Sequence, residues 1–297
     1  MRIRPFDYYA ATNLNDALER LENYGRDARV LAGGTDLVLA MKEGKIAPAH
    51  IVSLHGVKEL DYVNREGSII RIGSLAKHAD LAVAPTLKNN LPILCEAVRL
   101  IGSWQVRNVA TLGGNLCTAS PAADSAPPLL ALGARAVIAD RTGDKELDLG
   151  SFFKGPGETV LGPTQLLKEI IIPCSKRPSA GCFLKLMRKK AVDLALVNVA
   201  FYAETDPSTS KLTQVAIAMG GVAPTPIRSP EAEASLLNLS YSEALEKIQG
   251  AARLAVEATR PISDTRASAN YRRIVVEVFV RRAGEKTLNT LFKREGR

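Results

Sequence analysis

A pair of glycines followed by small polar residues lies between Thr111 and Asp124, in the run TLGGNLCTASPAAD. We interpret this run as a strand that leads into a loop. Gly113 and Gly114 would let backbone N–H groups come close to a bulky anion, as they do in phosphate-binding loops. Four later side chains can hydrogen-bond phosphate oxygens or the edge of a heterocycle, namely Asn115, Thr118, Ser120 and Asp124. The residues alone support a ligand site and an ordinary surface turn equally well.

A second glycine pair, Gly33 and Gly34, follows a short apolar strand expected at residues 28–31. Thr35 is predicted to cap the helix that comes next, and Asp36 then lies in the first turn of that helix. A strand, a glycine turn and a capped helix together have the geometry of an anion site. Because many α/β units turn on Gly-Gly, an ordinary turn is the better interpretation of this pair taken alone.

The elements that must position these glycine pairs follow from apolar periodicity and from capping residues. A helix is expected at 14–24, because Asn13 can cap it and Gly25 can end it. A hairpin is expected with its turn at Glu66 and Gly67. The other expected elements are strands at 50–54, 134–139, 166–173, 183–187, 193–205 and 212–219, helices at 77–83, 91–101 and 267–282, a loop at 150–165, a domain boundary at 174–181, and a helix after a capping box at Ser240 and Glu243.

Length and composition indicate a globular chain of two or three subdomains, with 297 residues, 46% hydrophobic and 24% charged. No apolar run is long enough to span a bilayer and the N-terminus lacks a secretory signal, so we expect a cytoplasmic protein. The net charge is +8, with short basic clusters at 188–190, 272–273 and 281–282. Because aromatics make up only 5% of the chain and the clusters carry no interleaved aromatic stacking platform, we expect no nucleic acid partner. A basic face for an acidic partner, or a solvated surface, is the expected use of this charge.

Cysteines and histidines give no sign of a metal site or of a nucleophile. The spacings between the four cysteines match no zinc or iron–sulfur ligand pattern. The three histidines are scattered, and the chain has no GxSxG, Walker A or GxGxxG sequence. We therefore expect no metal ligands and no catalytic residue of this chain's own.

Taken together, the two glycine pairs carry a family resemblance. AGGTDL at 32–37 and QVRNVATLGGNLCTASPAAD at 105–124 occur in this order, about 80 residues apart. The pair resembles the FAD-binding (medium) subunit of the molybdenum hydroxylase family, which includes xanthine dehydrogenase and carbon monoxide dehydrogenase. The resemblance continues through the IIIP strand at 170–173 and the stretch at 183–200, so it covers nearly the whole chain.

The resemblance implies an α+β fold with two domains. Residues 1–176 would form a vanillyl-alcohol-oxidase (PCMH)-type FAD-binding domain, with α/β subdomains at about 1–56 and 57–176. Residues 180–292 would form a smaller αβ domain of the carbon monoxide dehydrogenase flavoprotein C-terminal type.

The resemblance also implies a non-covalently bound FAD and the residues that hold it. Segment 30–37 would wrap the pyrophosphate, with the amides of Gly33, Gly34 and Thr35 as donors. Lys185 would bring a positive charge near the isoalloxazine, the alternative being a solvated strand residue, and Asp124 would reach the adenosine or ribityl part. Ile101 and Leu167 would line a ring of the FAD with apolar surface. The full implied set is Val30, Leu31, Ala32, Gly33, Gly34, Thr35, Asp36, Leu37, Ile101, Thr111, Gly113, Gly114, Asn115, Ser120, Asp124, Leu167 and Lys185.

The implied function is electron transfer within a larger oxidoreductase. The flavin would take electrons from iron–sulfur (2Fe-2S) clusters of a small partner subunit, which drain the molybdenum cofactor of a large subunit, and pass them to an external acceptor. A dimer of heterotrimers is the expected assembly. Two alternatives stay open: a stand-alone flavin-dependent reductase of the same superfamily, and a scaffold subunit that has lost its flavin.

Overall fold

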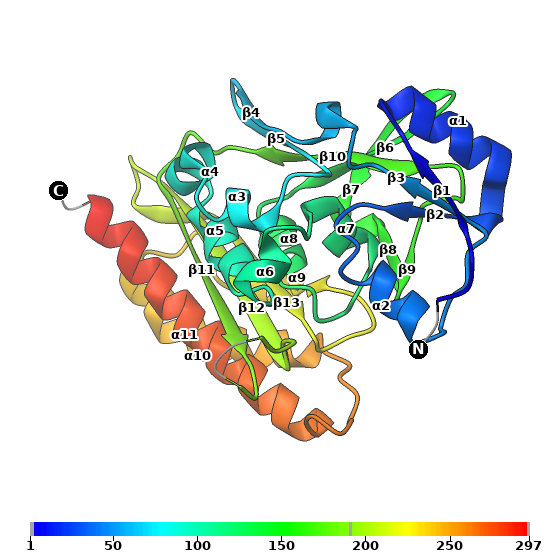
Figure 1. The fold of residues 1–297 in the computed structure, drawn as a ribbon. Coiled ribbons are helices and arrows are strands. Elements are labelled where there is room, and N and C mark those ends of the chain that lie inside the picture. Colours follow the sequence, from blue (N-terminus) through cyan, green and yellow to red (C-terminus); the bar gives the residue numbers. More distant parts are fainter. Residues whose placement is uncertain (1–2, 190–191, 296–297) are drawn as a thin grey trace.

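The computed structural model of the chain describes residues 3–189 and 192–295 (Figure 1). Lys190, the last residue of the first basic cluster, lies outside the described residues. Within the described ranges, no helix is both long enough and apolar enough to cross a membrane. The strands of this part of the chain form a three-stranded, a five-stranded and a four-stranded sheet and one short two-stranded hairpin.

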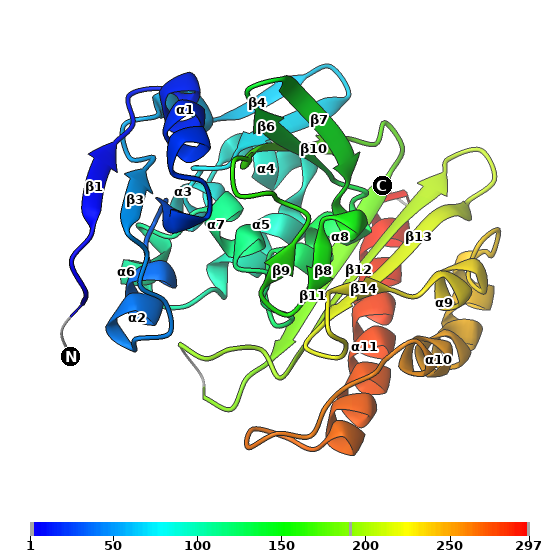
Figure 2. The ribbon, with the colours of Figure 1, turned by 90° about the vertical axis from the view of Figure 1, so that its right-hand side faces the viewer.

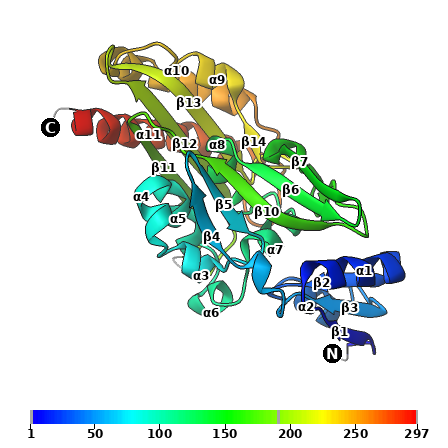
Figure 3. The ribbon, with the colours of Figure 1, turned by 90° about the horizontal axis from the view of Figure 1, so that it is seen from above.

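The N-terminal sheet is parallel, with β3 between β1 and β2. Its elements are β1 (Asp7–Ala10), α1 (Leu14–Tyr24), β2 (Ala28–Leu31), α2 (Leu37–Lys42) and β3 (His50–Ser53). The helix predicted at 14–24 is confirmed, since the Asn13 side chain accepts the Asp16 N–H at 2.9 Å and Gly25 ends the helix at φ +54°. Figure 3 shows this sheet, with α1 and α2, at the opposite end of the molecule from α10 and α11.

The predicted cap of α2 is wrong by one residue. Asp36, not Thr35, holds the N-cap position, and neither side chain caps the helix. Gly34 has a positive φ of +73°, so the chain is still turning there, and Thr35 and Asp36 complete that turn before Leu37 begins the helix. Thr35 is thereby left outside the helix.

The second sheet is antiparallel and has the order β4-β5-β10-β6-β7. Its strands are β4 (Val63–Glu66), β5 (Ile69–Gly73), β6 (Arg135–Asp140), β7 (Gly143–Asp148) and β10 (Leu166–Pro173). The helices that accompany it are α3 (His78–Leu81), α4 (Pro85–Asn90), α5 (Pro92–Arg99), α6 (Trp104–Arg107), α7 (Leu112–Cys117) and α8 (Ala126–Ala131). The loop expected at 150–165 contains the hairpin β8 (Phe153–Gly155) and β9 (Glu158–Thr159).

The run from Thr111 to Asp124 is not a strand that leads into a loop, as the sequence suggested. Leu112–Cys117 forms the short helix α7, so both glycines of the pair are helical. The Thr111 hydroxyl accepts the Gly114 N–H at 3.0 Å, which starts the helix at Leu112.

The C-terminal sheet has the order β11-β12-β13-β14 and is covered on both faces (Figure 2). Its elements are β11 (Ser179–Leu186), β12 (Val197–Asp206), β13 (Lys211–Gly220), β14 (Ile227–Arg228), α9 (Pro230–Ala234), α10 (Tyr241–Glu257) and α11 (Ala269–Glu295). Side chains alternate along each strand: Val199 and Phe201 pack with α10 and α11, while Ala200 and Tyr202 pack with the core around α5 and α8. This second face positions the residues discussed below.

The basic cluster at 272–273 is not simply solvated charge. Arg272 is 2% exposed and donates to the carbonyls of Leu196 and Gly221 and to the Asp264 carboxylate. The guanidinium therefore ties α11 to the ends of β12 and β13, a structural use that the sequence pattern did not reveal.

Candidate functional site

The two glycine pairs lie in segments that meet in space. We call residues 32–37 the first glycine segment and residues 109–118 the second glycine segment. A Cβ atom on Gly33 would lie 2.2 Å from the Val109 carbonyl oxygen, so only glycine allows this approach. The Thr118 hydroxyl lies 3.3 Å from Asp36 Oδ2, which makes a second contact between the segments. In Figures 1 and 2, α2 and α7 accordingly lie close together.

The first glycine segment offers a group of unused donors. Within the part of the chain that the structure describes, the N–H groups of Gly33, Gly34 and Thr35 donate no hydrogen bond, nor does the Thr35 hydroxyl. All three residues are half-buried. Adjacent free amides beside a hydroxyl form a donor set that suits anionic oxygens.

The second glycine segment differs, because its amides are occupied. Leu112 and Gly113 donate to the carbonyls of Ala76 and Ser74, at 2.9 and 2.8 Å, and Gly114 donates to Thr111. The amides of Gly113 and Gly114 are therefore not free to donate to an anion, and contact of this segment with a cofactor stays a prediction. The glycine at 113 serves close packing instead, since a Cβ atom there would lie 2.5 Å from the Ser74 Cβ.

Two polar residues of the predicted site lie in this segment or just after it. Asn115 is half-buried, and its Oδ1 accepts the Ser125 hydroxyl at 2.6 Å. Ser120 is half-buried, and its hydroxyl oxygen accepts the Ala122 N–H at 3.3 Å. The contact of both residues with a cofactor stays a prediction.

Asp124 and Lys185, predicted separately, contact each other. Lys185 Nζ lies 2.6 Å from Asp124 Oδ2, and the two side chains are only 1% and 7% exposed. Lys185 also donates to the Leu100 carbonyl at 2.8 Å, so the alternative of a solvated strand residue is wrong. Burial raises the pKa of Asp124, and the neighbouring Lys185 ammonium opposes that rise.

The apolar members of the predicted set have different surroundings. Ile101 and Leu167 are 8% and 4% exposed and belong to the large core cluster that also contains α5 and α8. Val30, Leu31 and Leu37 are half-buried beside the first glycine segment. The role of Ile101 and Leu167 in lining a ring, and that of the other three residues in wrapping the pyrophosphate, stay predictions.

Two buried polar residues beside the site were missed by the sequence interpretation. Asn198 is fully buried and donates to Asp124 Oδ1 at 2.9 Å. His78 is fully buried, and its backbone N–H donates to the Ala110 carbonyl at 3.1 Å. Burial, with a smaller effect of Arg107, lowers the pKa of His78 to about 4. A polar residue inside the apolar run VNVAF was the available signal for Asn198.

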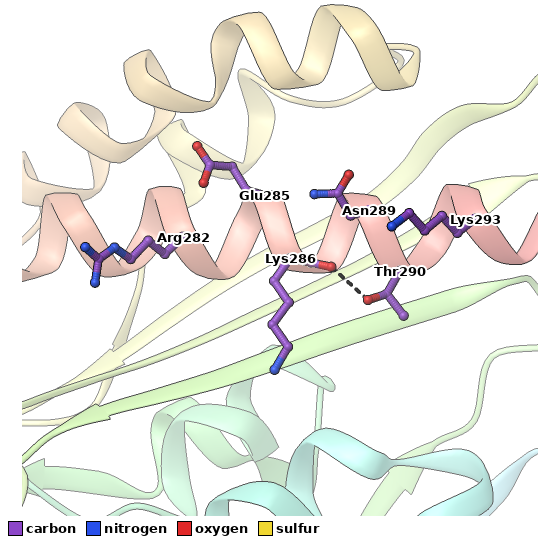
Figure 4. A pocket seen from close by; sticks show the side chains of 6 residues that line it. All are labelled: Arg282, Glu285, Lys286, Asn289, Thr290 and Lys293. Atoms are coloured by element: carbon purple, nitrogen blue, oxygen red, sulfur yellow. Dashed lines mark hydrogen bonds between the residues drawn. The ribbon is translucent and has the colours of Figure 1, made fainter.

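A groove of about 450 Å³ lies elsewhere, along the surface of α11. Figure 4 shows its lining of charged and polar side chains, Arg282, Glu285, Lys286, Asn289, Thr290 and Lys293. It lies away from both glycine segments, and no apolar or aromatic residue lines it to receive a flat aromatic ligand. We therefore place the candidate site at the glycine segments.

Comparison with protein families gives two matches. Residues 4–175 match the FAD-binding domain in molybdopterin dehydrogenase, and residues 182–287 match the CO dehydrogenase flavoprotein C-terminal domain. Among curated proteins, the carbon monoxide dehydrogenase medium chain of Hydrogenophaga pseudoflava is 31% identical, over 94% of this chain and 95% of that protein. The putative xanthine dehydrogenase FAD-binding subunit of Escherichia coli is 30% identical, over 93% of each.

Solved structures agree with these matches. Carbon monoxide dehydrogenase from Hydrogenophaga pseudoflava matches with a TM-score of 0.92 and 31% identity, covering 99% of each chain. Quinoline 2-oxidoreductase from Pseudomonas putida matches with a TM-score of 0.89 and 27% identity, covering 98% of this chain and 99% of the other. The α+β fold class and the resemblance carried by the glycine pairs are confirmed. The chain therefore belongs to the family of FAD-binding medium subunits of molybdenum hydroxylases of the carbon monoxide dehydrogenase and xanthine dehydrogenase type.

Proposed function

We propose that this chain binds one FAD non-covalently where the two glycine segments meet, and that it serves as the flavin subunit of a molybdenum hydroxylase. Bound FAD would supply two-electron and one-electron redox chemistry, linking iron–sulfur clusters of a small partner subunit to an external electron acceptor. The molybdenum cofactor would reside on a large partner subunit. These partners are taken from the family relation, and the donor set of this chain supports the flavin.

The observation that carries this proposal is the group of free donors at the first glycine segment. A pyrophosphate presents several anionic oxygens close together, and the amides of Gly33, Gly34 and Thr35 can donate to them without losing any bond within the described residues. Gly33 holds this segment against Val109. The residues present therefore fit the phosphate part of FAD.

The other side chains would orient the cofactor and exclude water. Ile101 and Leu167 would present apolar surface to a ring, and Asn115 and Ser120 would supply polar contacts from the second glycine segment and the turn that follows it. Asp124 and Lys185 would fix that turn, as described below. No residue of this chain needs to exchange a proton with a substrate in this scheme.

The larger organisation is also part of the proposal. We propose an FAD-binding domain at 1–176, with subdomains at about 1–56 and 57–176, and a C-terminal domain at 180–292. The two family matches, which end at residue 175 and begin at residue 182, support this division. A dimer of heterotrimers and a cytoplasmic location are proposed with it.

Gly33→Ala tests the site directly. The new Cβ atom would meet the Val109 carbonyl oxygen, push the glycine segments apart and misplace the free amides. Because a hydrogen bond to a charged group contributes roughly 1.5–3 kcal/mol, we expect FAD affinity to fall about tenfold or more. The measurement is a titration of the deflavinated chain with FAD, in which the quenching of flavin fluorescence reports binding.

Gly250→Ala is the matched control. Gly250 lies in α10, and a Cβ atom there would meet nothing within 4 Å, so FAD affinity should be unchanged. Equal affinity of the Gly33→Ala variant and the wild type would contradict the proposed site.

A further inference from the structure

The turn that follows the second glycine segment is held by the C-terminal sheet. We call residues 120–124 the SPAAD turn. The Pro121 carbonyl accepts the Gly221 N–H at 2.6 Å, and the Ala123 carbonyl accepts Asn198 Nδ2 at 3.3 Å. Asp124 accepts from Asn198 and from Lys185. A turn next to the candidate FAD site is thus fastened by strands that belong to the other end of the chain.

Strand register explains why Lys185 and Asn198 converge on one carboxylate. Lys185 of β11 pairs with Asn198 of β12, and Asn198 pairs with Gly220 of β13. Directly paired residues point to the same face of a sheet, and here this is the face that packs toward α5 and α8. The three positions form a row beneath the SPAAD turn.

Gly220 leaves the space that the Asn198 amide occupies. A Cβ atom at 220 would lie 2.4 Å from Asn198 Oδ1 and 3.1 Å from the Pro121 carbonyl oxygen. Asn198 itself is fully buried, and its Oδ1 has no hydrogen-bond partner within the described residues. Burying an amide whose oxygen has no hydrogen bond lowers the free energy of unfolding, and an apolar side chain would carry no such cost. The contribution of Asn198 therefore lies in the hydrogen bonds that its Nδ2 group donates.

The contacts continue from Asp124 to the predicted cofactor residues. Ser125, the next residue, is fully buried and donates its hydroxyl to Asn115 Oδ1 at 2.6 Å. Asn115 lies in α7, within the second glycine segment. If the Asp124 carboxylate moved, its neighbour Ser125 would move with it, and the hydrogen bond from Ser125 would then displace Asn115.

We propose that Asn198 is a positioning residue of the FAD site, which holds the SPAAD turn through Asp124 and so keeps the second glycine segment in its binding conformation. The inference rests on the proposed function, since it assumes that FAD occupies this site. It also makes the FAD site incomplete without the C-terminal sheet. Asn198 does not need to touch the cofactor for this role.

Asn198→Ala and Gly220→Ala test the inference independently. The first removes the Nδ2 donor, and the second displaces the amide without removing it. Because the lost bond is to a charged carboxylate, we expect each variant to bind FAD about tenfold more weakly than the wild type. The measurement is the dissociation constant for FAD at a temperature at which urea titration shows each variant to be folded.

Asn198→Asp adds a signature that lost stability alone would not give. At neutral pH the introduced carboxylate would face Asp124, and the Lys185 ammonium would be the one cation paired with both. When the introduced carboxyl group becomes protonated, its hydroxyl can again donate to Asp124. We therefore expect FAD affinity of this variant to recover as the pH falls toward about 5, while that of the Asn198→Ala variant does not recover.

Tyr202→Phe is the matched control, because it removes a buried hydrogen bond, to Glu204, on the same strand and the same face. Its FAD affinity should equal that of the wild type even if its stability falls. Wild-type affinity in the folded Asn198→Ala and Gly220→Ala variants, or an equal loss in the Tyr202→Phe variant, would overturn the inference. Failure of the wild-type chain to take up FAD would instead refute the proposed function.

Discussion

Among single residues, the Asp124–Lys185 pair changes the electrostatic expectation most. Lys185 was expected to bring a positive charge near the isoalloxazine, but a carboxylate lies 2.6 Å from its Nζ. Opposite charges this close form a nearly neutral unit, so the field that the pair projects onto a neighbouring ring is much weaker than that of a lone ammonium. We therefore expect the pair to act mainly by fixing the SPAAD turn.

Replacing only one member of this pair should lower the free energy of unfolding more than replacing both charged residues. Lys185→Met leaves Asp124 buried without its cation, a change that typically costs about 3–5 kcal/mol of unfolding free energy. In the Lys185→Met/Asp124→Asn double variant no uncompensated charge remains, and the loss should be smaller. Urea denaturation of the wild type and of the single and double variants measures this; additive losses would contradict a coupled pair.

At the scale of elements, α3 carries a buried histidine directly behind the second glycine segment. Both ring nitrogens of His78 lack a hydrogen-bond partner within the described residues, and the nearby Arg107 guanidinium also disfavours its protonation. The ring is therefore neutral in the folded chain at neutral pH.

This arrangement predicts a loss of stability in acid. The pKa of His78 is lowered from 6.5 to about 4 by folding, so below pH 6.5 the unfolded chain binds a proton that the folded chain does not. The contribution of His78 is complete above pH 6.5, falls as the pH drops from 6.5 to about 4, and changes no further below that, for a total of about 3 kcal/mol. Urea denaturation across this pH range measures it.

His78→Leu should remove that part of the pH dependence, because the leucine side chain does not titrate. His55→Leu, at an exposed position, is the control and should retain the wild-type profile. Identical pH profiles for His78→Leu and the wild type would show that His78 is not the group responsible.

The elements that sequence predicts well are those whose signals are local. Asn13 caps the start of α1 and Gly25 ends it, and Gly67, with its positive φ, lies in the turn of the hairpin β4–β5. The helix α7 was missed although its Thr111 cap is local, because two adjacent glycines disfavour a helix and its first amides, of Leu112 and Gly113, are held by Ala76 and Ser74, far back along the chain. Such contacts leave no pattern in the local run of residues.

For the whole molecule, the sequence identified the two glycine segments but not how they are held. Asn198 lies in a run that is apolar on both sides because both faces of β12 are covered, so strand alternation was hidden. Its relation to Asp124 depends on the register of three strands and on the docking of that sheet against α5 and α8. Only the folded chain brings them together.

The visible absorption spectrum of the chain purified alone, followed by acid release and identification of any bound nucleotide, tests the central claim most directly. We predict a flavin spectrum, one FAD released per chain and no iron. A colourless chain that also fails to take up added FAD would contradict the claim and favour a scaffold subunit without a flavin.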